Sequence, residues 1–156
     1  MLRLTPVFFA IAFCACVGIP DRNANNSKAF LETNALRAEV SETSTGLQYE
    51  VVDKGLGCRP RPGSTVEVHY EMRRYSSERV LDSSYQRREP ATYPLDQMIR
   101  GWAEGIPLMR EGATWIFYVP PELAYGRKGS GSIPPNEALV FVVELLDAKT
   151  CRRDAA

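Results

Sequence analysis

Apolar and polar residues alternate most regularly between residues 65 and 72, and this period of two predicts a β-strand. Its apolar face carries Val66, Val68, Tyr70 and Met72 and is expected to face the core, whereas His69 lies on the polar face. Four further runs have the length and composition of strands: 47–52, 91–95, 113–119 and 139–146. The last of these is apolar on both faces, which is typical of a strand inside a sheet.

Two stretches have helical periodicity instead. Ser27 to Val40 can form a short amphipathic helix with Ser27 as its N-cap. Ile99 and Trp102 are spaced i and i+3, so they share one face of a second short helix. Strands outnumber helices and do not alternate with them, which predicts an α+β fold. We expect a curled antiparallel sheet of about five strands wrapped over one short helix, with a short N-terminal helix.

The first residues differ from the rest of the chain. Arg3 precedes an apolar run from Pro6 to Val17, which is shorter than the roughly 20 residues of a membrane span. A basic start and a short apolar run are typical of a secretory signal peptide, and lipid attachment at Cys16 is a less favoured alternative. The expected organisation is a signal peptide at 1–20, a helical arm at 21–44, a single domain at 45–148 and a tail at 149–156.

Two cysteines, Cys58 and Cys151, remain outside this leader. An even pair suits an oxidising compartment, so we expect a secreted or cell-surface protein. If the strand near Thr65 and the last strand are antiparallel neighbours, the two cysteines approach each other; a disulfide and two free thiols both stay open. Asn25 begins a glycosylation acceptor, relevant only in a eukaryotic secretory pathway.

Charge and residue counts exclude several classes of function. The chain has 19 basic and 19 acidic side chains, without the concentrated basic face that nucleic acids require. His69 is the only histidine, which removes the main ingredient of Ser/His and Cys/His hydrolases and of His-rich metal sites. We therefore expect no cofactor, no metal, no nucleic acid partner and no membrane span.

The residues expected to line a hollow between sheet and helix are mostly aromatic and aliphatic: Tyr70, Leu81, Asp82, Met98, Ile99, Trp102, Tyr125, Ile133 and Phe141. Asp82 is the one acid among them, whereas paired-carboxylate hydrolysis needs two. A pocket without nucleophile or base suits rotation about a peptide bond before proline, whose barrier of about 18–20 kcal/mol comes from amide resonance. The twisted amide has less charge separation than the planar one, so an apolar site favours it.

The chain also resembles a known family in several stretches: VEVHY at 66–70, LDSS at 81–84, IRGW at 99–102, GATWIFYVP at 112–120, LAYG at 123–126 and IPPNEALVFVVELL at 133–146. These are similar to the FKBP-type peptidyl-prolyl cis-trans isomerases. KAFLE at 28–32 and TGLQYEV at 45–51 are most similar to the macrophage infectivity potentiator (Mip) branch. The resemblance spans about residues 45 to 148, so 45–148 is expected to be the isomerase domain.

The resemblance implies a catalytic set of Tyr70, Asp82, Ile99, Trp102, Tyr125 and Phe141. It implies a substrate-binding set of Leu81, Arg87, Met98 and Ile133. Trp102 would support the proline ring between aromatic walls. The backbone N–H of Ile99 and the hydroxyl of Tyr125 would bind carbonyl groups of a substrate or inhibitor, and Asp82 would place a dipole near the twisting amide. The implied partners are proline-containing polypeptides and tacrolimus- or rapamycin-like inhibitors.

Some positions depart from the family pattern. Leu81 stands where a phenylalanine is usual, and Ala91 stands where an aromatic residue is frequent. Both changes bear on inhibitor affinity and substrate preference. The long helical arm that pairs two subunits in the Mip branch is short here, so we expect a monomer.

Two alternatives to the isomerase stay open. A binding module could keep the fold and hold a partner without turnover, although the presence of the whole pocket set favours the enzyme. A role in host interaction is a third hypothesis, which rests on the branch name and the leader alone.

Overall fold

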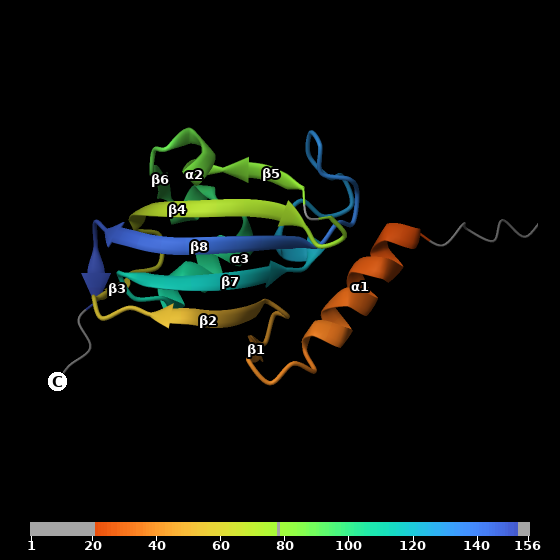
Figure 1. Ribbon diagram of the computed structural model, residues 1–156, viewed down its shortest axis with the longest axis horizontal. Coiled ribbons are helices and arrows are strands. Elements are labelled where there is room, and N and C mark those ends of the chain that lie inside the picture. The colour runs from red at the N-terminus through yellow and green to blue at the C-terminus, as the bar shows by residue number, and fades with distance from the viewer. Residues whose placement is uncertain (1–20, 78, 153–156) are drawn as a thin grey trace, which may run out of the picture.

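The computed structural model describes residues 21–77 and 79–152, so the expected signal peptide and Cys16 lie outside the described residues (Figure 1). The main sheet is antiparallel and has seven strands in the order β1-β2-β7-β8-β4-β5, with β6 also paired to β4. Their bounds are β1 Val40–Glu42, β2 Gln48–Lys54, β4 Thr65–Arg74, β5 Val80–Ser83, β6 Ala91–Pro94, β7 Ala113–Val119 and β8 Leu139–Ala148. A separate two-stranded ribbon pairs β3, Arg59–Pro60, with β9, Cys151–Arg152.

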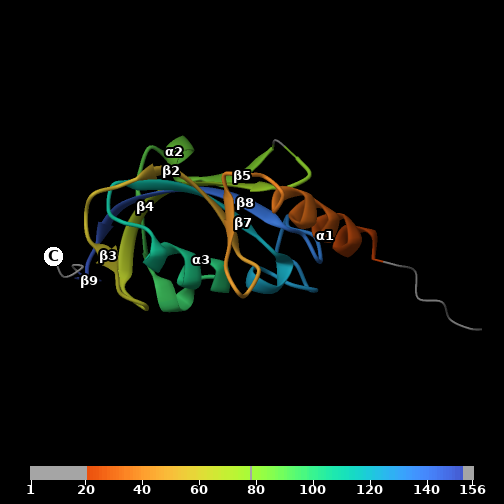
Figure 2. The same ribbon diagram turned by 90° about the horizontal axis from the view of Figure 1, so that it is seen from below.

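The sheet curves over α3, Arg100–Gly105, which lies against its concave face (Figure 2). The other short helical segments are α2 Ser84–Arg87, η1 Leu95–Gln97, η2 Ile106–Leu108 and η3 Pro121–Leu123. Two glycines allow α3 to approach the sheet closely. A Cβ at Gly101 would lie 2.7 Å from Val119 Cγ1, and one at Gly105 would lie 2.6 Å from the Phe117 ring. Larger residues at these positions would push α3 away from the sheet.

The predicted fold class is confirmed, with an open antiparallel sheet, a short helix on it and an N-terminal helix. Val66, Val68 and Tyr70 face the core, as the alternation predicts. β8 lies between β7 and β4, as its apolar faces indicate. The sheet has seven strands rather than about five, because β1 and β5 are short and lie in polar stretches. β1 and β5 are strands because they pair with longer neighbouring strands, and the local sequence pattern does not reveal this pairing.

The N-terminal helix differs from the prediction at both ends. α1 spans Arg22–Asn34, and its N-cap is Asp21, whose carboxylate accepts the N–H groups of Asn23 at 3.0 Å and Ala24 at 3.2 Å. The predicted N-cap role of Ser27 is therefore wrong. Ser27 is buried inside α1 instead, where tertiary contacts satisfy its hydroxyl. The predicted end at Val40 is also wrong, because Val40 begins β1.

α1 is fastened to the sheet domain near both of its ends. The Ser27 hydroxyl donates to the Asn136 carbonyl at 2.8 Å and accepts the Ala138 N–H at 3.0 Å. Near the other end, the Asn34 amide donates to the Gln48 side chain at 2.9 Å, and Gln48 in turn donates to the Leu31 carbonyl at 2.9 Å. These are buried or part-buried hydrogen bonds between residues far apart in sequence, so they order the helix on its own domain.

Cys58 and Cys151 form a disulfide with a Cα–Cα distance of 5.7 Å. It links the two sides of the β3–β9 ribbon, and β4 and β8 are antiparallel neighbours, as the close approach of the two cysteines requires. Of the two alternatives left open, the structure contains the bonded one. Within the described residues, none of the helices combines the length and apolar character that crossing a membrane requires.

Replacing Cys58 and Cys151 with alanine should lower the free energy of unfolding by about 2–4 kcal/mol, because the bond closes a large loop in the unfolded chain. Urea unfolding with and without dithiothreitol measures this. The reductant should destabilise the wild type and leave the double variant unchanged. A wild type equally stable with and without reductant would contradict the structural role of this bond.

Candidate active site

A cavity of about 140 Å³ opens between the concave face of the sheet and the start of α3. It is lined by Tyr70, Met72, Asp82, Tyr93, Met98, Ile99, Trp102, Tyr125 and Phe141. These residues come from β4, β5, β6, β8, the N-terminal end of α3 and the loop after η3. The curl of the sheet therefore brings together side chains that are up to 71 positions apart, from Tyr70 to Phe141.

The indole of Trp102 forms the floor and is only 1% exposed. Three aromatic rings meet it edge to face, with centroid distances of 5.3 Å for Tyr70, 5.8 Å for Tyr93 and 5.5 Å for Phe141. Such pairs are favoured by the quadrupoles of the rings and fix the indole in place. Tyr125 lines the same cavity and is 36% exposed, so one wall of the cavity reaches the surface.

One polar network runs along the wall of the cavity. The Asp82 carboxylate accepts short hydrogen bonds from the Tyr70 hydroxyl and from Arg87. Arg87 also donates to the Tyr70 hydroxyl at 3.1 Å, and its guanidinium lies 5.6 Å from the centre of that ring. The hydroxyl of Tyr93 is 3.2 Å from that of Tyr70. Asp82 is thus held by two donors before any ligand binds.

The pKa shifts describe a site with one carboxylate and neutral phenols. Burial raises the pKa of Asp82, but the hydrogen bonds from Tyr70 and Arg87 outweigh it, so the net pKa is lowered. Burial, followed by the hydrogen bond to Asp82, raises the pKa of Tyr70. Burial and the charge of Asp82 also raise the pKa of Tyr125. None of these groups is poised to exchange a proton near neutral pH, so the cavity lacks a general base.

Local structure explains why Arg87 reaches Asp82. Ser83 caps α2 by accepting the Gln86 N–H at 3.3 Å, and Arg88 ends the helix in the left-handed conformation with φ 59°. This single turn places Arg87 five residues after Asp82, on the same side of β5.

Two donor groups on residues that line the cavity lack partners within the described part of the chain. The Ile99 carbonyl accepts the N–H groups of Trp102 at 3.0 Å and Ala103 at 3.1 Å as the N-cap of α3, whereas the Ile99 N–H has no hydrogen bond. The Tyr125 hydroxyl likewise has no partner among these residues, although the hydroxyl of Tyr70 is fully engaged. Both are donors at the edge of an apolar cavity, which is where a ligand carbonyl would bind.

Most of the residues named from the sequence meet in this cavity: Tyr70, Asp82, Met98, Ile99, Trp102, Tyr125 and Phe141. Arg87 contacts the network without lining the cavity. Leu81 precedes Asp82 in β5, so it faces away and lines a separate hollow with Arg74 and Ser132. Ile133 is buried in the core and does not line the cavity. Leu81 and Ile133 therefore do not line this cavity, and their substrate-binding roles stay predictions.

Sequence reasoning missed two lining residues. The sequence pattern could have indicated Met72, because it shares the inward face of β4 with Tyr70. Tyr93 lies on β6 beside Pro94, in a segment whose sequence predicts an edge strand and gives no sign that Tyr93 lines a cavity. Its ring meets those of Tyr70 and Trp102, so Tyr93 is one of three aromatic walls around Trp102.

A family model described as FKBP-type peptidyl-prolyl cis-trans isomerase matches residues 57–146. A second, described as the domain amino terminal to FKBP-type peptidyl-prolyl isomerase, matches residues 19–51. This chain belongs to the FKBP-type peptidyl-prolyl cis-trans isomerase family. The resemblance stated from the sequence motifs is thereby confirmed.

This FKBP-type chain is similar to two groups of bacterial proteins, named Mip and FkpA. Peptidyl-prolyl cis-trans isomerase Mip of Coxiella burnetii is 47% identical over 128 residues, covering 81% of this chain and 55% of the relative. FkpA of Aeromonas hydrophila is 45% identical over 124 residues, covering 80% of this chain and 46% of the relative. The crystal structure of FkpA from Escherichia coli has a TM-score of 0.78 at 42% identity and covers 81% of this chain and 59% of that one. The chain spans about half the length of the curated relatives it matches.

The lowered pKa of Asp82 predicts a pH dependence of stability. A depressed folded-state pKa contributes stability above the ordinary value of 3.8, and this contribution disappears as the pH falls through the folded-state value. Asp82→Asn should therefore be less stable than the wild type at neutral pH, and the difference should shrink below pH 3.8. Urea unfolding at several pH values tests this. A difference that stays constant or widens on acidification would contradict it.

Proposed function

We propose that this chain is a peptidyl-prolyl cis-trans isomerase that binds the twisted imide of an X-Pro bond in the cavity over Trp102. The observation that carries the proposal is the combination of an indole floor, three aromatic edges around it and two donors that have no partner among residues 21–77 and 79–152. A prolyl ring is a compact apolar group that suits this floor.

The chemistry needs no proton transfer. Rotation has to overcome the loss of amide resonance, which makes a barrier of about 18–20 kcal/mol. In the twisted state the carbonyl and nitrogen carry less charge, so a site with little water favours it over the planar ground state. The absence of a general base among the cavity residues fits this reaction and does not fit hydrolysis.

The rim donors would hold the peptide on either side of the proline. The Ile99 N–H and the Tyr125 hydroxyl would donate to substrate carbonyls, which fixes the chain while the imide rotates. Asp82 keeps its negative charge because Tyr70 and Arg87 hold it, so it presents a fixed dipole beside the twisting amide. The same groups would bind the carbonyls of tacrolimus- or rapamycin-like inhibitors.

Compartment and assembly are further parts of the proposal. The Cys58–Cys151 disulfide is typical of an oxidising environment, which supports a secreted or cell-surface protein after removal of the leader. The fastening of α1 to its own domain supports a monomer, since the helix has partners within the same chain.

A protease-coupled isomerisation assay on a short X-Pro peptide tests the activity. Asp82→Leu/Tyr125→Phe should lower kcat/KM by about tenfold or more, because it removes a charged acceptor and a donor at the reacting group. Asp147→Leu/Tyr85→Phe is the matched control. It makes the same changes on the outer surface, where Tyr85 bonds Glu144 and Asp147 pairs with Lys149.

Each result of this assay decides the proposal. A fall in the cavity variant alone, with circular dichroism unchanged, supports it. Equal rates for both variants and the wild type, or a wild type no faster than the uncatalysed reaction, would overturn it. The second of these outcomes would favour the binding module, in which the fold holds a partner without turnover.

A further inference from the structure

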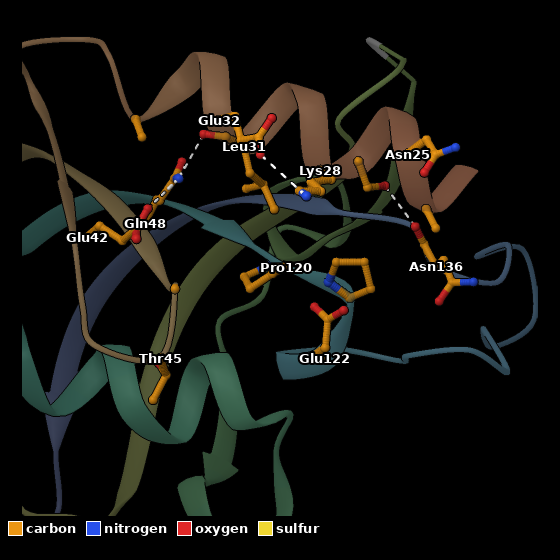
Figure 3. Close-up of a pocket in the computed structure, with 15 residues that line it drawn as sticks. Asn25, Lys28, Leu31, Glu32, Glu42, Thr45, Gln48, Pro120, Glu122 and Asn136 are labelled. Carbon is orange, nitrogen blue, oxygen red and sulfur yellow. Dashed lines mark hydrogen bonds and ion pairs between the residues drawn. The ribbon is translucent and has the colours of Figure 1, made fainter. Parts of the chain in front are cut away.

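A second cavity, of about 790 Å³, lies between α1, the β1–β2 hairpin and η3 (Figure 3). It is several times larger than the cavity over Trp102 and lies within the size range of ligand sites in proteins, roughly 300–1,000 Å³. The proposed isomerase chemistry uses none of its lining residues.

The walls of this groove are held in place. The hydrogen bonds of Ser27 fasten one end of α1, and those of Asn34 and Gln48 fasten the other, so the helix spans the groove with both ends fixed. A site whose walls are already ordered loses less entropy on binding than a flexible one. The floor is apolar and comes from Leu31, Pro120 and Pro121.

The rim is acidic. Glu32 on α1, Glu42 on β1 and Glu122 on η3 line the groove from three elements, and they surround the same hollow in Figure 3. Lys28 is the one basic residue in the lining, and it already pairs with Glu32 at 3.7 Å. Glu122 makes no ion pair within residues 21–77 and 79–152. The groove is thus net negative on a chain whose formal charge is zero.

We propose that this groove binds an extended, basic segment of polypeptide in which lysine or arginine residues alternate with apolar ones. The apolar side chains would cover Leu31 and the two prolines, and the cations would reach the three carboxylates. An acidic segment or a nucleic acid would meet repulsion from the same rim.

The groove adjoins the candidate active site through one turn. Pro121 lines the groove, Tyr125 lines the cavity, and the Gly126 N–H donates to the Pro121 carbonyl at 2.8 Å across this turn. If the proposed isomerase function holds, the bound segment is a basic stretch of the same client polypeptide whose proline enters the cavity. The preference of the groove for basic segments does not depend on that function.

Binding of a proline-free probe separates the two proposals. The probe is a short fluorescent peptide in which lysine alternates with alanine and leucine, and its counterpart carries glutamate in place of lysine. Fluorescence anisotropy should show saturable binding of the lysine peptide only. Glu32→Lys/Glu122→Lys should weaken it by about tenfold, because two exposed attractions become repulsions. Glu89→Lys/Glu67→Lys makes the same charge changes outside the groove and should leave the affinity within about twofold.

Nuclear magnetic resonance locates the site. The lysine peptide should shift the amide signals of Leu31, Thr45 and Glu122 and leave that of Trp102 in place. Equal binding of both peptides, no loss in the groove variant, an equal loss in the control variant, or shifts confined to the cavity over Trp102 would each overturn the groove proposal. Concentration-dependent shifts of the groove signals without peptide would overturn it as well, because they would show a second copy there.

The isomerisation assay on a short uncharged X-Pro peptide should give equal rates for Glu32→Lys/Glu122→Lys and the wild type. Failure of peptide binding with normal isomerisation would remove the groove proposal alone. Normal binding of the lysine peptide without isomerisation would remove the proposed function alone.

Discussion

The close packing of α3 on the concave face of the sheet is the contact on which the rest of the structure depends. Gly101 and Gly105 lie one turn apart and leave room for Val119 and Phe117 of β7. The same approach sets the depth of Trp102, whose indole meets the edges of Tyr70, Tyr93 and Phe141. A wider spacing between helix and sheet would open these contacts and remove the floor of the cavity.

The chemical character of the cavity follows from that packing and from one polar network. Burial raises the pKa of the phenols of Tyr70 and Tyr125, and hydrogen bonds from two donors lower the pKa of Asp82. Among the described residues of the cavity, a fixed charge and rim donors surround an apolar floor without a general base, which suits the proposed rotation of an amide. The groove beside α1 differs in kind, because its polar groups are carboxylates around an apolar floor. The two sites therefore suit different parts of one polypeptide.

The features that could be predicted from the sequence are those that depend on residues close together in the chain. The alternation of 65–72 predicts the inward face of β4, and the spacing of Ile99 and Trp102 places both on one cavity. Asp82 and Tyr125 are among the residues expected to line the hollow, but only the family resemblance gives them roles, which periodicity alone does not. The start of α1 was missed because Ser27 has the chemistry of an N-cap, whereas its actual partners, Asn136 and Ala138, are more than 100 positions away.

The same reason explains the other differences between prediction and structure at the site. Leu81 and Asp82 are neighbours in a strand, so only one of them can face the cavity, and the choice depends on the pairing of β5 with β4. Tyr93 enters the cavity because β6 pairs with the first half of β4, which no local pattern shows. The disulfide depended on the pairing of β3 with β9 in the same way.

The most direct test of the central claim is a nuclear Overhauser measurement on the protein with an X-Pro peptide. The peptide exchanges between its free and bound forms while its cis and trans isomers interconvert. The account predicts contacts between the protons of the pyrrolidine ring and the indole of Trp102, together with upfield shifts of those ring protons from the aromatic ring currents. Isomerisation of the peptide with its proline protons near other residues and without contact to the Trp102 indole would contradict the account.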